Sequence, residues 1–224
     1  MGVTPEELAK VYPCLYHMAD AQSWENIRKH GLLSTTALLD LYEVKGEDRA
    51  RIEERHRPEC VEITHAAHRR AVVRDQKPLI ESKLRKSLKD CTVEEWYRLL
   101  NKYVFFWLTK DRLKTMLCAR AYRNSSHIVL TIDALPLVKR YAERIVLSPM
   151  NSGNTQPIAH PRGLETFQEM RNYPFQERAK YGDYYQVVEL AIKGRADVNE
   201  SVRSVDLMQC DGKGMRTLIN IFRR

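Results

Sequence analysis

The chain has 224 residues, of which 43% are hydrophobic and 29% are charged, a balance that excludes a disordered chain and allows a sizeable core. No apolar run approaches the roughly 20 residues needed to cross a bilayer, and the polar start at Met1–Lys10 leads us to expect no signal peptide. The net charge of +8 and the isoelectric point near 9.2 favour an anionic partner such as nucleic acid.

The five cysteines are scattered, odd in number and not paired by their spacing, which predicts a reducing, cytoplasmic location. The chain shows no internal repeat and no low-complexity tract. We therefore expect one domain over residues 1–224.

The first elements in the chain are short. A helix is predicted over residues 4–12, because Thr4 is a good N-cap. A strand follows at Leu15–Met18, and an amphipathic helix at Ser23–His30. His17 lies near the end of this strand, where its side chain could face a ligand.

The segment 45–101 differs in composition from its surroundings. Residues 45–89 carry 13 Lys/Arg and 8 Asp/Glu, with few large apolar side chains. Thr92 and Glu95 form the sequence pattern of a capping box, which predicts a helix start. We expect this segment to be a largely helical, basic insertion or lid.

The next part of the chain alternates between apolar strands and helices. Its predicted elements are, in order, a strand at 103–109, a helix from Lys110 to about Tyr122, a strand at 127–132, a helix at 134–141 and a strand at 144–148.

Residues 149–185 contain several prolines and glycines, which predicts a long loop, and long loops are usually functional or disordered. Five aromatic residues argue against disorder: Tyr173, Phe175, Tyr181, Tyr184 and Tyr185. The last strong strand is predicted at Tyr185–Ile192 and contains Glu189. A turn is expected at 212–214 and a strand-like end at Met215–Phe222. This order of elements, without strict alternation of strands and helices, predicts an α+β fold.

Common catalytic motifs are missing from the sequence. There is no phosphate-binding Gly-x-x-x-x-Gly-Lys, no Gly-x-Gly-x-x-Gly and no Gly-x-Ser-x-Gly. His65 and His68 have helical spacing, but no further ligand pattern accompanies them, so we expect no metal. What remains is His17, the Phe105–Arg112 strand-to-helix junction and Glu189. A carboxylate between apolar neighbours needs a reason, because burying it unpaired costs several kcal/mol.

These three features together resemble the DarT-like ADP-ribosyltransferase superfamily. Its opening pattern is matched by Leu15-Tyr16-His17, followed by a helix and Gly31-Leu32-Leu33-Ser34. Its aromatic strand before a helix is matched by Val104–Arg112, and its late-strand glutamate by Glu189. The basic segment 45–101 has no counterpart in this pattern. The resemblance implies an ADP-ribosyltransferase-like split β-sheet core that carries this segment as an insertion.

The resemblance implies NAD as co-substrate and a role for each matched residue. Cleavage of the nicotinamide–ribose bond passes through an oxocarbenium-like state, which a carboxylate at Glu189 would stabilise. His17 would hydrogen-bond a ribose. Trp107 would sandwich the nicotinamide ring, with Thr109 and Tyr122 as alternatives.

Two arginines are expected to bind the pyrophosphate through their forked guanidinium groups. Arg112 follows the aromatic strand, and Arg162 lies in a turn-rich part of the long loop.

The resemblance also implies an acceptor base in single-stranded nucleic acid and a role as a toxin or phage-defence effector, with an antitoxin or immunity protein as partner. Single strands need positive charge and stacking platforms, which we assign to Tyr181, Tyr184 and Tyr185. The alternative is that these aromatics only pack the loop.

Other functions stay open on the sequence alone. One is another reaction on the same fold, either NAD hydrolysis or RNA 2′-phosphate transfer, which His160-Pro161-Arg162 would suit. Another is a non-enzymatic basic module that binds nucleic acid and in which His17 and Glu189 are structural.

Overall fold

Two helix starts follow the pattern of the capping box. The structure is a computed structural model that describes residues 2–211 and 214–224. In α1 (Pro5–Val11), the Glu7 amide donates to Thr4 Oγ1 at 3.2 Å, and the Thr4 amide donates to the Glu7 carboxylate at 2.9 Å. The same exchange between Thr92 and Glu95 begins α6 (Val93–Asn101), so both predicted helix starts are confirmed.

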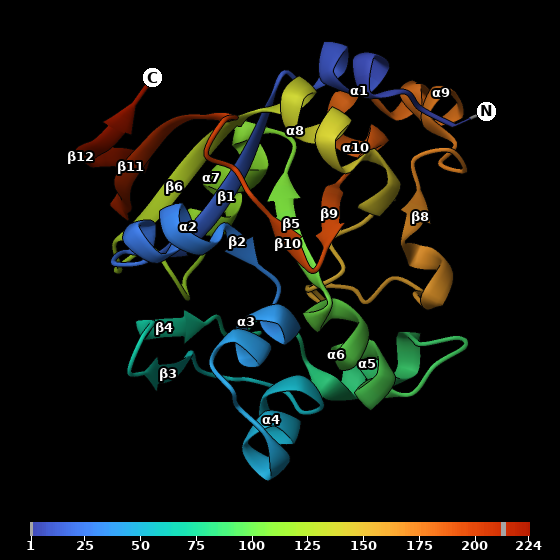
Figure 1. Ribbon diagram of the computed structural model, residues 1–224. Coiled ribbons are helices and arrows are strands. Elements are labelled where there is room, and N and C mark those ends of the chain that lie inside the picture. The colour runs from blue at the N-terminus through green and yellow to red at the C-terminus, as the bar shows by residue number, and fades with distance from the viewer. Residues whose placement is uncertain (1, 212–213) are drawn as a thin grey trace.

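An eight-stranded antiparallel sheet forms the upper part of the molecule in Figure 1. The strand order is β12-β11-β6-β1-β5-β9-β7-β8. The strands are β1 (Cys14–Asp20), β5 (Tyr103–Trp107), β6 (His127–Asp133), β7 (Ile145–Ser148), β8 (Gln168–Glu169), β9 (Glu189–Lys193), β11 (Val202–Asp211) and β12 (Gly214–Arg223). A separate pair is formed by β2 (Leu32–Leu33) and β10 (Arg195–Ala196).

Helices cover this sheet and connect its strands. They are α2 (Trp24–His30), α7 (Lys110–Leu117), α8 (Ala134–Tyr141), α9 (Phe175–Arg178) and α10 (Asp183–Gln186), with the 3-10 turns η1 (Ala142–Arg144), η2 (Leu164–Thr166) and η3 (Ala179–Tyr181). The main core includes fully buried residues from α1, α8 and the central strands, such as Leu8, Leu15, Leu130 and Val138. The chain is therefore an α+β protein, as the order of its elements predicted.

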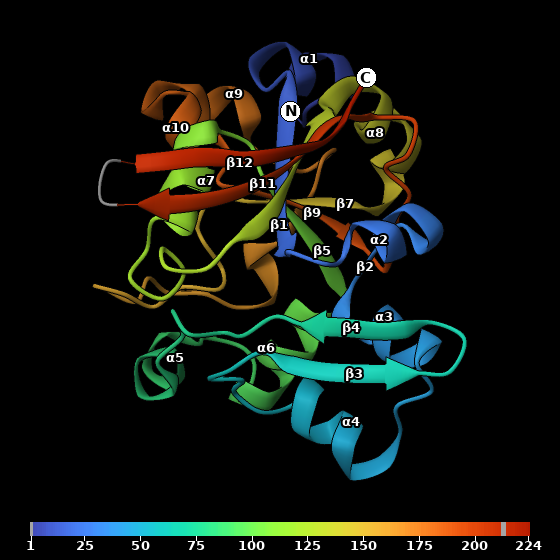
Figure 2. The ribbon, with the colours of Figure 1, turned by 90° about the vertical axis from the view of Figure 1, so that its left-hand side faces the viewer.

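The segment 35–101 forms the lower part of the molecule, which Figures 1 and 2 show beneath the sheet. It contains α3 (Thr35–Leu41), α4 (Gly46–Glu53), β3 (Val61–His65), β4 (Arg69–Val73), α5 (Glu81–Ser87) and α6. It has one apolar cluster of its own under the hairpin, and it supplies most of a second cluster around Trp96, to which Phe167 from outside the segment also belongs. The expectation that 45–101 is largely helical is corrected here, because 61–73 is a β-hairpin. Apolar and polar residues alternate at Val61–Thr64, and β-branched residues favour strands.

Two strand assignments in the last third of the chain were also inaccurate. Strand β9 begins at Glu189 instead of Tyr185, because the preceding residues form α10. The Tyr12 hydroxyl holds this turn by donating to the Asp183 carbonyl at 2.7 Å and accepting from the Val187 amide at 3.1 Å. Strand β11 is a long strand at Val202–Asp211 for which the sequence analysis predicted no strand. The turn expected at 212–214 includes residues 212–213, which lie outside the described part of the chain.

Two of the cysteines are paired. Cys118, at the end of α7, forms a disulfide with Cys210 of β11, while Cys14, Cys60 and Cys91 are free. The prediction of unpaired cysteines is therefore wrong for this pair, and the cysteines no longer argue for a reducing compartment. Spacing could not reveal a bridge between residues 92 positions apart. None of the helices that the structure describes could span a bilayer, being either too short or too polar.

Candidate active site

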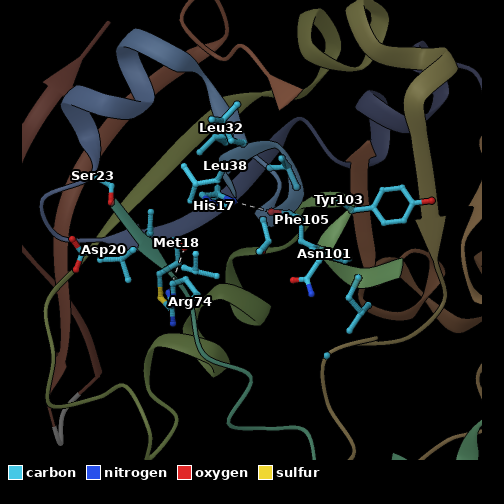
Figure 3. Close-up of a pocket in the computed structure, with 18 of the residues that line it drawn as sticks. His17, Met18, Asp20, Ser23, Leu32, Leu38, Arg74, Asn101, Tyr103 and Phe105 are labelled. Carbon is cyan, nitrogen blue, oxygen red and sulfur yellow. Dashed lines mark hydrogen bonds between the residues drawn. The ribbon is translucent and has the colours of Figure 1, made fainter. Parts of the chain in front are cut away.

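A separation of two central strands creates the site. Strands β1 and β5 share one register pair, Tyr16 with Trp107. Beyond this pair the ladder between β1 and β5 stops, and the His17 side chain extends from β1 toward β5. Its Nδ1 lies 2.8 Å from the Phe105 carbonyl oxygen, as the dashed line in Figure 3 shows. Since a carbonyl can only accept, Nδ1 carries the proton and donates.

A cavity of about 350 Å³ occupies the space beside this separation. This volume falls within the usual size range of small-molecule sites. Its walls come from β1, the α2–β2 turn, α3, β4, α6 and β5, and from the turn at 151–153. The cavity therefore lies between the large sheet and the lower part of the molecule, and residues distant in the sequence meet there (Figure 3).

Four residues expected from the sequence line this one cavity: His17, Trp107, Glu189 and Tyr122, the alternative to Trp107. The sheet register explains two of them. Trp107 pairs with Tyr16 on one side and with Glu189 on the other, so Tyr16, Trp107 and Glu189 form a row across β1, β5 and β9. The aromatic strand and the glutamate of the late strand therefore meet at this cavity.

Glu189 is only 4% exposed, and burial raises the pKa of its carboxyl group to about 7. One oxygen, Oε2, accepts a hydrogen bond from the Ser152 amide at 3.0 Å. This bond and the positive charges of Arg112 and Arg162 oppose the increase in pKa. Glu189 therefore exchanges its proton near neutral pH, which suits an acid–base or charge-stabilising role.

Arg162 does not line the cavity but supports the turn that contacts Glu189. Its side chain is 2% exposed, and Nη1 donates to the Ser152 carbonyl at 2.9 Å. Its Nε donates to the His160 carbonyl at 3.1 Å. The expected role in binding pyrophosphate is therefore replaced by a positioning role, since these carbonyls occupy the guanidinium fork.

His17 is neutral in this environment. Burial lowers its pKa to about 4, although the hydrogen bond to the Phe105 carbonyl acts in the opposite direction. With the proton on Nδ1, the Nε2 atom carries a lone pair and can accept a hydrogen bond. His17 can thus accept from a hydroxyl group in the cavity, and it cannot act as a cation near neutral pH.

Two aromatic side chains of the cavity could stack on a ligand ring. Trp107 is partly exposed there, and Tyr122 is 3% exposed. The Tyr122 hydroxyl donates to Asp75 Oδ1 at 2.6 Å, and the Arg74 guanidinium lies 5.0 Å from the ring centre. Burial together with this hydrogen bond raises the pKa of Tyr122. Because the Tyr122 ring is held this way, Trp107 remains the better stacking surface.

Thr109 and Arg112 lie outside the cavity wall, contrary to the roles expected for them. The Thr109 hydroxyl caps α7 by accepting from the Arg112 amide at 3.3 Å. Arg112 donates through Nε at 3.1 Å, and through Nη2, to the Tyr184 carbonyl. Its guanidinium also lies 3.9 Å from the centre of the Tyr184 ring. Arg112 thus connects α10 to α7, and its positive charge lowers the pKa of Glu189.

The three tyrosines expected to bind substrate also lie outside the cavity, at or near the molecular surface. Tyr181 is 53% exposed and Tyr185 is 56% exposed, whereas Tyr184 is half-buried against Arg112. Arg178 and Lys180 lie 5.3 Å and 5.1 Å from the Tyr181 ring centre. The remaining two aromatics of this loop, Tyr173 and Phe175, belong to the core.

Several lining residues were not expected, namely Arg57, Arg74, Asp75 and Ser152. All four come from the insertion or from the long loop, where no motif marks them. In the part of the chain that the structure describes, no group of three or more His, Cys, Asp or Glu residues is arranged to hold a metal ion.

The fold and the site define an α+β protein with one buried carboxylate and a neutral histidine in a ligand-sized cavity. The chain belongs to the DUF7002 family, described as a family of unknown function, whose model matches residues 13–202. The matched range includes β1, β5 and β9, and therefore the whole row of residues at the cavity. No curated protein and no solved structure matched the chain.

Proposed function

We propose that this protein is an NAD-dependent ADP-ribosyltransferase that modifies nucleic acid. One observation supports this most: His17, Trp107 and Glu189, from three distant segments, line a single cavity. This set offers a hydrogen-bond acceptor, a stacking surface and a buried carboxylate. Those are the groups that cleavage of a nicotinamide–ribose bond requires.

Glu189 carries the chemical step in this proposal. Its ionised form would stabilise the positive charge that develops on the ribose as nicotinamide departs. With a pKa of about 7, roughly half of the molecules carry this charge at neutral pH, and the fraction increases with pH. A positively charged nicotinamide ring beside the carboxylate would favour the ionised form further.

His17 and Trp107 would position the substrate. His17 Nε2 would accept from a ribose hydroxyl, while the Phe105 carbonyl holds the imidazole in the required tautomer. Trp107, paired with Glu189 across β5 and β9, would stack on the nicotinamide ring next to the reacting bond.

The acceptor would bind at the surface of α10 and η3. Its exposed tyrosines, Tyr181 and Tyr185, offer platforms for unpaired bases, and Arg178 and Lys180 supply positive charge beside them. Two residues separate α10 from Glu189 at the start of β9. A cytoplasmic toxin or phage-defence effector, restrained by an antitoxin or immunity protein, would be consistent with such an activity.

The test uses NAD labelled in its adenylate phosphate, incubated with separate pools of single-stranded DNA, RNA and protein. We expect label transfer to a nucleic-acid pool by the wild type, and a loss of at least 100-fold in Glu189→Gln. The exposed Glu143 provides a matched control, and Glu143→Gln should keep full activity. Free ADP-ribose without transfer would instead indicate an NAD glycohydrolase, and no cleavage of NAD would refute both.

A further inference from the structure

The loop between β7 and η2, residues 149–163, joins the large sheet to the lower part of the molecule. It runs between the sheet and the segment 78–90, which includes α5 (Figures 1 and 2). Residues 151–153 of this loop line the cavity, and so do Pro78 and Leu79 of the segment. Contacts between the loop and the segment are therefore contacts between two walls of the site.

The first contact joins Thr155 to the start of α5. Thr155 is fully buried, and its hydroxyl oxygen accepts from the amide of Ile80, the N-cap residue of α5, at 2.8 Å. The Thr155 amide donates to the Pro78 carbonyl at 3.2 Å, and its hydroxyl lies 3.4 Å from the same carbonyl. A hydroxyl can both accept and donate, so this single side chain connects the loop to two backbone groups of the lower part.

The second contact joins Arg162 to the end of α5. The Arg162 amide donates to the Ser87 carbonyl at 2.9 Å, and the Lys89 amide donates to the Arg162 carbonyl at 3.0 Å. An exposed contact follows, in which Asp90 Oδ1 accepts from the Leu164 amide at 2.9 Å. The loop is thus attached to the lower part of the molecule at two separate places.

Both attachments act on Ser152. The Arg162 side chain donates to the Ser152 carbonyl at 2.9 Å, and the Ser152 amide donates to Glu189 Oε2 at 3.0 Å. Ser152 is 1% exposed and comes three residues before Thr155. Since a hydrogen bond to a carboxylate favours its charged form, the position of this amide affects how readily Glu189 ionises.

We propose that Thr155 is a positioning residue of the candidate active site. By attaching the loop to the lower part of the molecule, it holds the Ser152 amide against the Glu189 carboxylate and favours the ionised form. The inference rests on the proposed function and deepens it, because the ionised form is the one that would stabilise the charge on the ribose. The segment 45–101, for which the ADP-ribosyltransferase pattern offered no counterpart, then supports the reacting carboxylate through this loop.

Titration of the Glu189 carboxyl group by NMR tests the inference without any substrate. The proteins are isotopically labelled in their glutamate carboxyl groups, and the spectrum of Glu189→Gln identifies the signal of Glu189. Thr155→Val removes the hydroxyl and nearly keeps the shape of the side chain, and the pKa of Glu189 should rise by about one unit. Thr155→Ser keeps the hydroxyl and should restore the wild-type pKa.

Two comparisons distinguish this role from a general loss of stability. Thr36→Val removes a hydroxyl that donates from α3 to Glu53 of α4, and it should leave the pKa of Glu189 unchanged. In a protein that cleaves NAD, Thr155→Val should release nicotinamide about 5-fold more slowly than the wild type at pH 7 and at nearly the wild-type rate at pH 9. A merely structural defect would lower both rates equally.

Asp90→Ala provides a second test, should Thr155→Val fail to fold. It removes the exposed acceptor of the Leu164 amide, and the pKa of Glu189 should again rise. Loss of a negative charge by itself can only lower the pKa of a carboxyl group, so a rise would come from the loop. An unchanged or lowered pKa in this variant would count against the inference.

The outcomes separate this role of Thr155 from the proposed function. An unchanged pKa of Glu189 in folded Thr155→Val, or an equal rise in Thr36→Val, would overturn the positioning role even if the protein cleaves NAD. A rise in Thr155→Val that Thr155→Ser reverses, in a protein that leaves NAD intact, would support the positioning of Glu189 and reject the proposed function.

Discussion

Replacing Glu189 with glutamine should change how the stability of the protein depends on pH. Burial raises the pKa of Glu189 from its ordinary 4.5 to about 7, so the folded state holds this proton more tightly than the unfolded chain does. The stabilising contribution is therefore fully present below pH 4.5 and is lost as the pH rises through about 7.

The size of the effect follows from the two pKa values. Between pH 5 and pH 8.5, wild-type protein should lose about 2.5 kcal/mol of unfolding free energy through this group. The amide side chain of the Glu189→Gln variant cannot ionise and should not contribute to any loss. Other titrating groups are common to both proteins and cancel in the comparison.

Urea unfolding of both proteins at the two pH values measures this difference. Wild type should lose about 2.5 kcal/mol more than Glu189→Gln between pH 5 and pH 8.5. Glu143→Gln, which changes an exposed carboxyl group, should follow the wild type. If wild type and Glu189→Gln lose the same amount, Glu189 does not titrate near neutral pH and the reasoning about its burial is wrong.

Three further predictions concern groups around the site. Burial lowers the pKa of His17 from 6.5 to about 4, so its stabilising contribution is present above pH 6.5 and is lost as the pH falls through 4. In urea unfolding between pH 7.5 and pH 4.5, the wild type should therefore lose about 2.5 kcal/mol more unfolding free energy than His17→Gln, and equal losses would contradict this. Arg112→Met removes the hydrogen bonds to the Tyr184 carbonyl and should lower the unfolding free energy by about 1–3 kcal/mol. It should also move the pH midpoint of nicotinamide release upward, because a positive charge near Glu189 is lost, and an unchanged midpoint would refute this electrostatic effect. The Cys118–Cys210 disulfide closes a long loop, so its reduction should lower the unfolding free energy by about 2–5 kcal/mol. A dithiol should therefore lower the unfolding midpoint of the wild type and leave that of a Cys118→Ser/Cys210→Ser variant unchanged, and an unchanged wild-type midpoint would contradict the disulfide.

Features set by local chemistry could be predicted from the sequence. The Thr-x-x-Glu patterns at Thr4 and Thr92 both begin helices, because each pair satisfies its own backbone donors. The apolar run at Tyr103–Trp107 forms a central strand of the large sheet. Glu189 could be singled out because a carboxylate between apolar residues needs a reason to be buried.

Features that depend on long-range contacts could not be predicted in this way. Nothing local distinguishes Arg57, which lines the cavity, from Arg112 and Arg162, which do not, and all three donate to backbone carbonyls. Residues Asp183–Gln186 include two tyrosines suited to a strand, yet Tyr12 from the other end of the chain holds them as a helical turn. The partner of an arginine is determined by the fold, so its role was open until the fold was known.

Release of nicotinamide from NAD tests the central claim most directly. At pH 8, where Glu189 is mostly ionised, the wild type should release nicotinamide, and Glu189→Gln should do so at least 100-fold more slowly while remaining folded, as its urea unfolding transition would show. Equal rates in the two proteins, or no release by the wild type in the presence of single-stranded DNA or RNA, would contradict the assignment of this cavity as an NAD-cleaving site.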